Sequence, residues 1–146
     1  MTWKQLLAEN RITAEPASRH EIQDLRGVVR RNIADAQINE LSDDGRFSHA
    51  YDAARILANI VVRATGHRVK GDGGGHYNTF LALKAADPAF EKMAVYLDAC
   101  RRKRNNFLYE RANIVSYTEM EELLWHVSAF SLEVDAWLKK RHPHLI

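Results

Sequence analysis

The sequence has little that points to covalent cross-links, secretion or a membrane. It holds one cysteine, Cys100, in 146 residues, which excludes an internal disulfide and a cysteine-based metal pair. No apolar run approaches the roughly 18 residues that a membrane-spanning helix needs, so we expect no contact with a membrane. The N-terminal residues lack the apolar region of a signal peptide, and we therefore expect a cytoplasmic protein.

Net charge is also small. The formal charge is +2, so no overall polybasic field is present, and any nucleic-acid contact must come from a local patch. The chain is 46% apolar and 27% charged, which is ordinary for a globular protein. Its length predicts a single domain over residues 1–146, in which residues 1–17 are a short amphipathic N-terminal extension.

Sustained alternation of apolar and polar residues is absent, whereas helical spacing recurs along nearly the whole chain. We expect helices over residues 3–9, about 19–36, about 43–65, about 77–86, about 88–111 and about 116–141. Four of these are long and amphipathic, and modest loops join them. The sequence therefore predicts an all-α protein, an antiparallel up-and-down four-helix bundle with short extra helices.

Local signals set the ends of these helices. Ser18 and Glu21 have the spacing of a capping box, and Ser116 with Glu119 or Thr118 with Glu121 offers another. Residues 66–76 hold five of the seven glycines, so we expect an irregular and mobile connection there. This connection lacks the Gly-Lys-Ser/Thr ending of a phosphate-binding P-loop.

The most informative segment is a run of four cations, residues 101–104, inside an expected helix. The apolar line that precedes it consists of Phe90, Met93, Leu97 and Cys100. Continuing the seven-residue spacing from Leu97 leads to Arg104, so a guanidinium is directed where a core residue belongs. Such a group needs polar partners or a cleft. Departures from a local rule of this kind often mark functional sites.

Arg104-Asn105 on the third long helix, followed by Tyr109, resembles the motif of the HEPN (higher eukaryotes and prokaryotes nucleotide-binding) family. Residues 50–55 on the second long helix and Gly75-His76 add to the resemblance, which covers about residues 18–141. The layout of Trp3, Leu6 and Leu7 before a proline also looks like a bacterial branch of the family. It implies a bundle of four to five helices, usually a homodimer. Many members are metal-independent ribonucleases, and several are toxins paired with a small nucleotidyltransferase antitoxin.

The chain departs from the family motif in one respect. The motif is an arginine, a polar residue and a histidine after four to six further positions, but here those positions hold Tyr109, Glu110 and Arg111. A tyrosine, with a pKa of about 10, is a poor base at neutral pH. Glu110 is an alternative base, but it lies one step, about 100°, round the helix from Tyr109. His76 is an alternative source of the missing imidazole.

The resemblance and the cation run together predict a binding module of a toxin–antitoxin or defence system. Arg101, Arg104 and Asn105 are the expected phosphate-binding residues, with RNA, a nucleotide or a partner protein as ligand. The alternative is a metal-independent ribonuclease whose catalytic residues are Arg104, Asn105 and Tyr109. A third hypothesis is structural, with Arg104 holding a dimer together.

Expected partners are a second copy of the chain, RNA or a nucleotide, and a nucleotidyltransferase-type antitoxin. No cofactor and no metal site are expected. Glu122 and His126 have helical i, i+4 spacing, but no third ligand lies within reach in the sequence.

Overall fold

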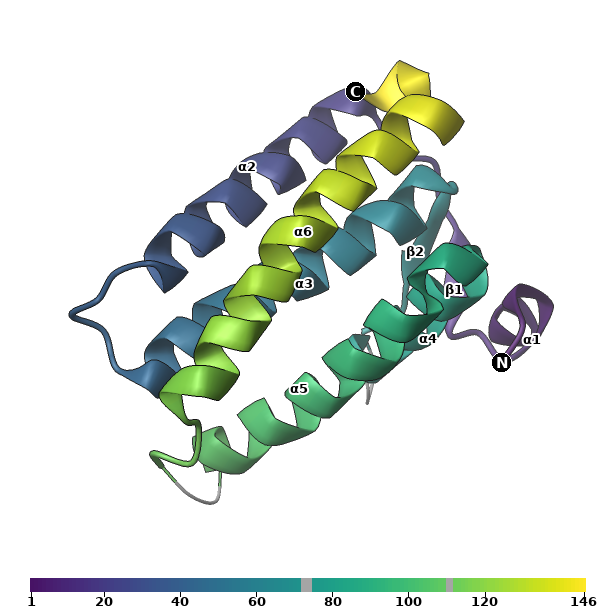
Figure 1. The fold of residues 1–146 in the computed structure, drawn as a ribbon. Coiled ribbons are helices and arrows are strands. Elements are labelled where there is room, and N and C mark those ends of the chain that lie inside the picture. Colours follow the sequence, from purple (N-terminus) through teal and green to yellow (C-terminus); the bar gives the residue numbers. More distant parts are fainter. Residues whose placement is uncertain (72–74, 110–111) are drawn as a thin grey trace.

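The computed structural model describes residues 1–71, 75–109 and 112–146, without the side chain of Tyr109 (Figure 1). The elements are α1 (Trp3–Ala8), β1 (Ile12–Ala14), α2 (Arg19–Ala36), α3 (Asp43–Ala64), β2 (His67–Val69), α4 (Gly75–Ala86), α5 (Glu91–Tyr109) and α6 (Tyr117–Arg141), with 3-10 turns at Pro88–Phe90 and Pro143–Leu145. The chain is therefore all-α, as predicted, with one small sheet. In the described part, no helix combines the length and the apolar character needed to cross a membrane.

Helix α3 lies at the centre of the packing. It contacts α2, α4, α5 and α6, and Figure 1 shows α2 and α5 on opposite sides of α3 and α6. Most of α3 is buried because its apolar residues occupy nearly all faces, including Leu57, Ile60 and Val61. Leu97, Val127 and Phe130 join them from α5 and α6 to form one continuous core, and the burial of such side chains is the main stabilising term of a fold.

The helix starts follow the predicted caps with one correction. Ser116 and Glu119 close a full capping box at α6, and the Thr118 alternative is not used. At α2, Ser18 Oγ accepts from the Glu21 backbone N–H at 3.1 Å, but the Glu21 carboxylate does not return to the cap. It pairs with Arg63 instead, because a charge-assisted bond to a buried guanidinium is stronger than a bond to a neutral N–H.

The two strands were not predicted. β1 and β2 pair antiparallel, with Ile12 opposite Val69 and Ala14 opposite His67. Each strand has three residues, which is too short for alternation to be recognised. The predicted irregular segment 66–76 was therefore wrong at both ends, because β2 occupies 67–69 and α4 begins at Gly75; residues 72–74 lie outside the described residues.

The start of the third long helix also differs from the prediction. Asp87 caps the turn before the third long helix, as expected, but Pro88–Phe90 form a 3-10 turn and the α-helix begins at Glu91. The predicted end of this helix at Arg111 falls outside the described residues. Gly66 ends α3 with a φ of 80°, a left-handed conformation that glycine adopts without strain.

Arg63, at the C-terminal end of α3, holds the N-terminal segment against the helices. Its side chain is only 2% exposed, and its Nε donates to Glu21 Oε2 at 2.7 Å. The two Nη atoms donate to three backbone carbonyls, those of Glu15, Pro16 and His67, at 2.7–3.1 Å. One guanidinium thus satisfies carbonyl oxygens both of the chain before α2 and of the first residue of β2.

Arg63→Met is expected to lower the free energy of unfolding by about 3 kcal/mol, because it leaves a carboxylate and three carbonyls without their donor. Urea denaturation followed by circular dichroism measures the change. Arg31→Met, at an exposed position of α2, is the control and should have little effect. Equal stability of the two variants would contradict the role assigned to Arg63.

Candidate functional site

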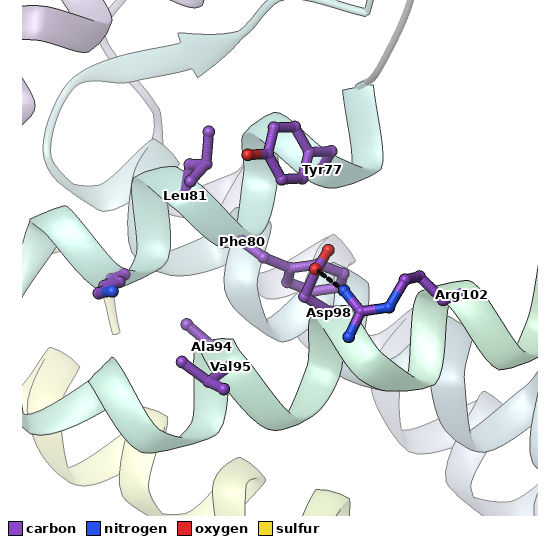
Figure 2. Close-up of a pocket in the computed structure, with 8 residues that line it drawn as sticks. Tyr77, Phe80, Leu81, Ala94, Val95, Asp98 and Arg102 are labelled. Atoms are coloured by element: carbon purple, nitrogen blue, oxygen red, sulfur yellow. Dashed lines mark hydrogen bonds and ion pairs between the residues drawn. The ribbon is translucent and has the colours of Figure 1, made fainter. Parts of the chain in front are cut away.

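The four consecutive cations of α5, residues 101–104, contact different partners. Arg101 Nε donates to Asp98 Oδ1 at 2.7 Å. Arg102 Nη1 donates to Asp98 Oδ2 at 2.5 Å (Figure 2). Lys103 forms an ion pair with Glu119 on α6. The three cations before Arg104 therefore each have a carboxylate partner on α5 or α6, and the run is not a uniform basic patch.

Arg104 lies against the core, as its spacing predicted. Its side chain is 20% exposed, and its guanidinium carbon lies 5.1 Å from the centre of the Tyr51 ring. Nη2 lies 3.5 Å from Asp52 Oδ1. The aromatic face and the carboxylate both favour the cation there, so α3 supplies the surroundings of the predicted site residue.

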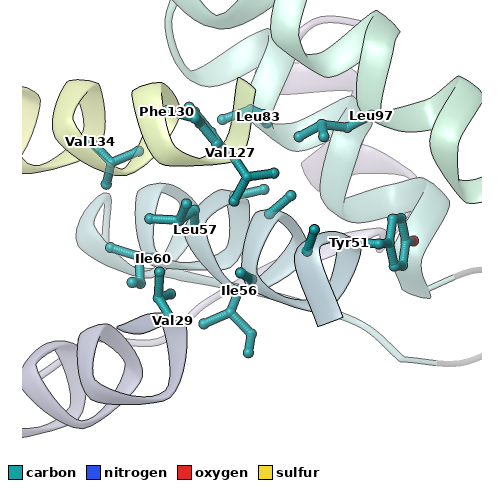
Figure 3. Close-up of a cluster of buried hydrophobic side chains, with 14 of the residues drawn as sticks. Val29, Tyr51, Ile56, Leu57, Ile60, Leu83, Leu97, Val127, Phe130 and Val134 are labelled. Carbon is teal, nitrogen blue, oxygen red and sulfur yellow. The ribbon is translucent and has the colours of Figure 1, made fainter. Parts of the chain in front are cut away.

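Tyr51 connects Arg104 to a histidine. The tyrosine is fully buried, and Figure 3 shows it at one end of the core cluster with its hydroxyl directed away from the apolar side chains. The hydroxyl lies 3.0 Å from His76 Nδ1. Burial raises the pKa of Tyr51, against the opposing effect of the nearby arginines, so the phenol keeps its proton and remains a hydrogen-bonding group for the imidazole.

His76 stands on the first turn of α4, and the structure brings it to the site from 25 residues along the chain. Its pKa falls to about 4, first because of burial and then because of the charges of Arg55 and Arg104. The imidazole is therefore neutral at pH 7. It can donate or accept a hydrogen bond, and it is a weaker base than an unperturbed histidine.

Arg55 completes the cluster from α3, one turn after Tyr51. The Nε atoms of Arg55 and Arg104 are both buried, and neither has a hydrogen-bond partner among the described residues. A buried donor without an acceptor is costly. Asp52, at 3.5 Å from Arg104 Nη2, supplies one negative charge against two guanidiniums. The cluster thus carries excess positive charge together with unsatisfied N–H groups, the combination that an oxyanion satisfies.

Asn105 does not join the cluster. Asn105 is partly exposed, lies about 100° round the helix from Arg104, and makes no side-chain hydrogen bond within the described part of the chain. The side chain of Tyr109 and the whole of Glu110 and Arg111 lie outside the described residues. Arg101 is the second predicted residue that reaches the cluster, since its charge contributes to the lowered pKa of His76.

The sequence prediction missed Asp52 and Arg55 as site residues. The signal was present, because Tyr51, Asp52 and Arg55 are the polar members of an otherwise apolar stretch of α3. A carboxylate and a guanidinium three residues apart lie on the same face of a helix, so both are directed towards the same neighbouring helix. That neighbour, α5, could not be identified without the tertiary structure.

The structure also describes Cys100 and the pair formed by Glu122 and His126. Cys100 is buried, and burial raises the pKa of its thiol to about 11, so it is an unreactive core thiol. Glu122 Oε1 and His126 Nε2 lie 3.8 Å apart. Among the described residues, no group of three or more His, Cys, Asp or Glu side chains could hold a metal ion.

Comparison with known proteins adds no relative. No protein-family model, no curated protein and no solved structure matches the chain. The assignment of a function therefore depends on the geometry of the site.

Arg104→Gln is expected to raise the pKa of His76 from about 4 towards its usual value near 6.5, because it removes a cation that opposes the imidazolium. Titration of the imidazole by NMR measures this change. Arg31→Gln, an exposed change on α2, should leave the value where it is. A His76 pKa that is the same in both variants would place Arg104 too far away to act on it.

Proposed function

We propose that this protein binds the phosphate groups of RNA or of a nucleotide at the cluster formed by Arg104 and Arg55. The observation that carries the proposal is the pair of buried guanidinium Nε atoms that have no hydrogen-bond partner in the described part of the chain. The phosphate-binding role predicted for Arg104 and Arg101 is kept, and Arg55 takes the place of Asn105.

The chemistry of the cluster fits an oxyanion. Guanidinium groups bind phosphate through two parallel N–H bonds, and such bonds strengthen away from water. Asp52, 3.5 Å from Arg104 Nη2, orients the guanidinium without neutralising both arginines. Neutral His76 adds a donor beside them in the tautomer whose Nδ1 accepts from Tyr51 and whose Nε2 carries the proton.

We also propose that the helices form a HEPN-like antiparallel up-and-down bundle. Arg104 on α5 faces Tyr51 and Asp52 on α3, which supports this proposal. A homodimer, a cytoplasmic location and a nucleotidyltransferase-type antitoxin partner are further parts of the same proposal. Trp125 and Leu132, seven residues apart on α6 and largely exposed, give α6 an apolar outer face.

Arg104→Ala and Arg55→Ala are each expected to weaken binding of a fluorescein-labelled single-stranded RNA about tenfold or more, the loss associated with a hydrogen bond to a charged group. Each should also reduce the slope of log Kd against log salt by about one, because one phosphate contact is lost. Fluorescence anisotropy at several salt concentrations measures both quantities.

Arg31→Ala is the matched control, since it removes the same charge from an exposed position of α2. Circular dichroism establishes that each variant is folded. If all three variants lose affinity equally, binding depends on total charge and the cluster is not the site.

A second function, metal-independent cleavage of RNA, is favoured by one observation, the 3.0 Å contact between Tyr51 Oη and His76 Nδ1. In this reaction the active tautomer is the one whose Nδ1–H donates to Tyr51 Oη, so that Nε2 is free to take the proton of a 2′-hydroxyl while the 2′ oxygen bonds to phosphorus. The bond between phosphorus and the 5′ oxygen breaks, the 5′ oxygen takes a proton from water, and a 2′,3′-cyclic phosphate remains. Arg104 and Arg55 stabilise the charge on the phosphate oxygens.

If this activity is present, His76→Gln should abolish cleavage measured in EDTA, whereas RNA binding should persist because Arg104 and Arg55 remain. The wild-type rate should rise as the pH increases through about 4 and then level off, because the neutral imidazole is the active form. A single-stranded DNA of the same sequence should resist cleavage, because it lacks the 2′-hydroxyl. Wild-type cleavage that persists in His76→Gln would assign the activity to another base or to a contaminant.

A further inference from the structure

A groove between α4 and α5 adjoins the phosphate cluster. It encloses a cavity of about 220 Å³. Figure 2 shows Tyr77 and Leu81 on α4 across from Ala94 and Val95 on α5, with the Asp98–Arg102 pair at one end. The groove therefore has apolar and aromatic walls with a carboxylate at one end.

Arg101 joins the groove to the cluster. Its guanidinium carbon lies 5.4 Å from the centre of the Tyr77 ring, and its charge also acts on His76 and Tyr51. His76 and Tyr77 are consecutive on the first turn of α4, so one points into the cluster and the other lines the groove. A ligand that spans the two must place different chemical groups on either side of Arg101.

The bonding of the arginines differs between the two sides. In the groove, Arg101 and Arg102 both donate to Asp98, and Lys84 pairs with Glu91 at 3.7 Å. In the cluster, the Nε atoms of Arg104 and Arg55 have no partner among the described residues. A neutral, flat group attached to an anion matches this arrangement, because the anion satisfies the unbonded N–H groups and an apolar peptide would not.

We propose that the α4–α5 groove is the base-binding subsite of the phosphate site, and that its ligand is single-stranded RNA. An unpaired nucleobase lies against the Tyr77 ring, and the adjoining phosphate binds Arg104 and Arg55. The inference depends on the proposed function. Tyr77 is 41% exposed, so part of its ring is free to stack, and aromatic stacking is the usual way in which proteins hold unpaired bases. Asp98 can accept from an exocyclic amino group.

The test compares two probes of equal length, a single-stranded RNA and the same backbone with abasic residues. Tyr77→Ala is expected to weaken binding of the base-bearing RNA about tenfold, the loss associated with one stacked base, and to leave the abasic probe unchanged. Tyr77→Phe should retain both affinities. Arg104→Ala should weaken the binding of both probes alike. A double-stranded RNA should bind to Tyr77→Ala and to the wild type with equal affinity.

Tyr117→Ala, which removes an exposed tyrosine of α6, is the matched control and should change neither affinity. If Tyr77→Ala weakens both probes equally, Tyr77 acts through Arg101 and the base subsite is wrong. If Arg104→Ala weakens binding and Tyr77→Ala does not, the phosphate site stands and the base subsite falls. If neither variant changes binding, the proposed function itself fails.

Sedimentation of the same variants tests a second occupant. A change of oligomeric state in Tyr77→Ala, with unchanged affinity for RNA, would make the groove a contact between copies of the chain and would overturn the base subsite.

Discussion

The buried guanidinium of Arg63 is the interaction on which the arrangement around the site depends. It fixes the chain before α2 and the start of β2 to the end of α3. The strand pairing then carries the constraint towards α4, because the Lys70 N–H donates to the Arg11 carbonyl, and Arg11 Nη1 donates to the buried Asn78 Oδ1 at 2.9 Å. The first turn of α4, with His76, is thus positioned by the N-terminal segment rather than by the long helices alone.

Arg63 and Arg104 show how one residue type can serve two purposes. Every nitrogen of the Arg63 guanidinium donates to a carboxylate or a carbonyl, so nothing remains for a ligand to satisfy. Arg104 has an aromatic face and a carboxylate 3.5 Å away, and its Nε has no partner among the described residues. A fully bonded arginine stabilises the fold, whereas an incompletely bonded one retains affinity for an anion.

Helix positions and the direction of Arg104 followed from the sequence because both depend on local periodicity and on side chains three or four residues apart. Ser18, Ser42 and Ser116 begin helices where their neighbours in sequence allow a cap. The strands, the contact of His76 with Tyr51 and the diversion of Glu21 to Arg63 did not follow. Each joins residues that are 25 or more positions apart, and short elements of this kind carry no periodic signal.

The place of Arg101 between Tyr77 and His76 has a thermodynamic consequence. Its charge disfavours the imidazolium of His76, and its guanidinium lies over the Tyr77 ring. Whatever occupies the groove and shifts Arg101 must alter the proton affinity of His76. Linkage is reciprocal, so protonation of His76 must alter the affinity of that occupant by the same factor. The pKa of His76 and the affinity of the groove for its ligand are then thermodynamically coupled through the side chain of Arg101.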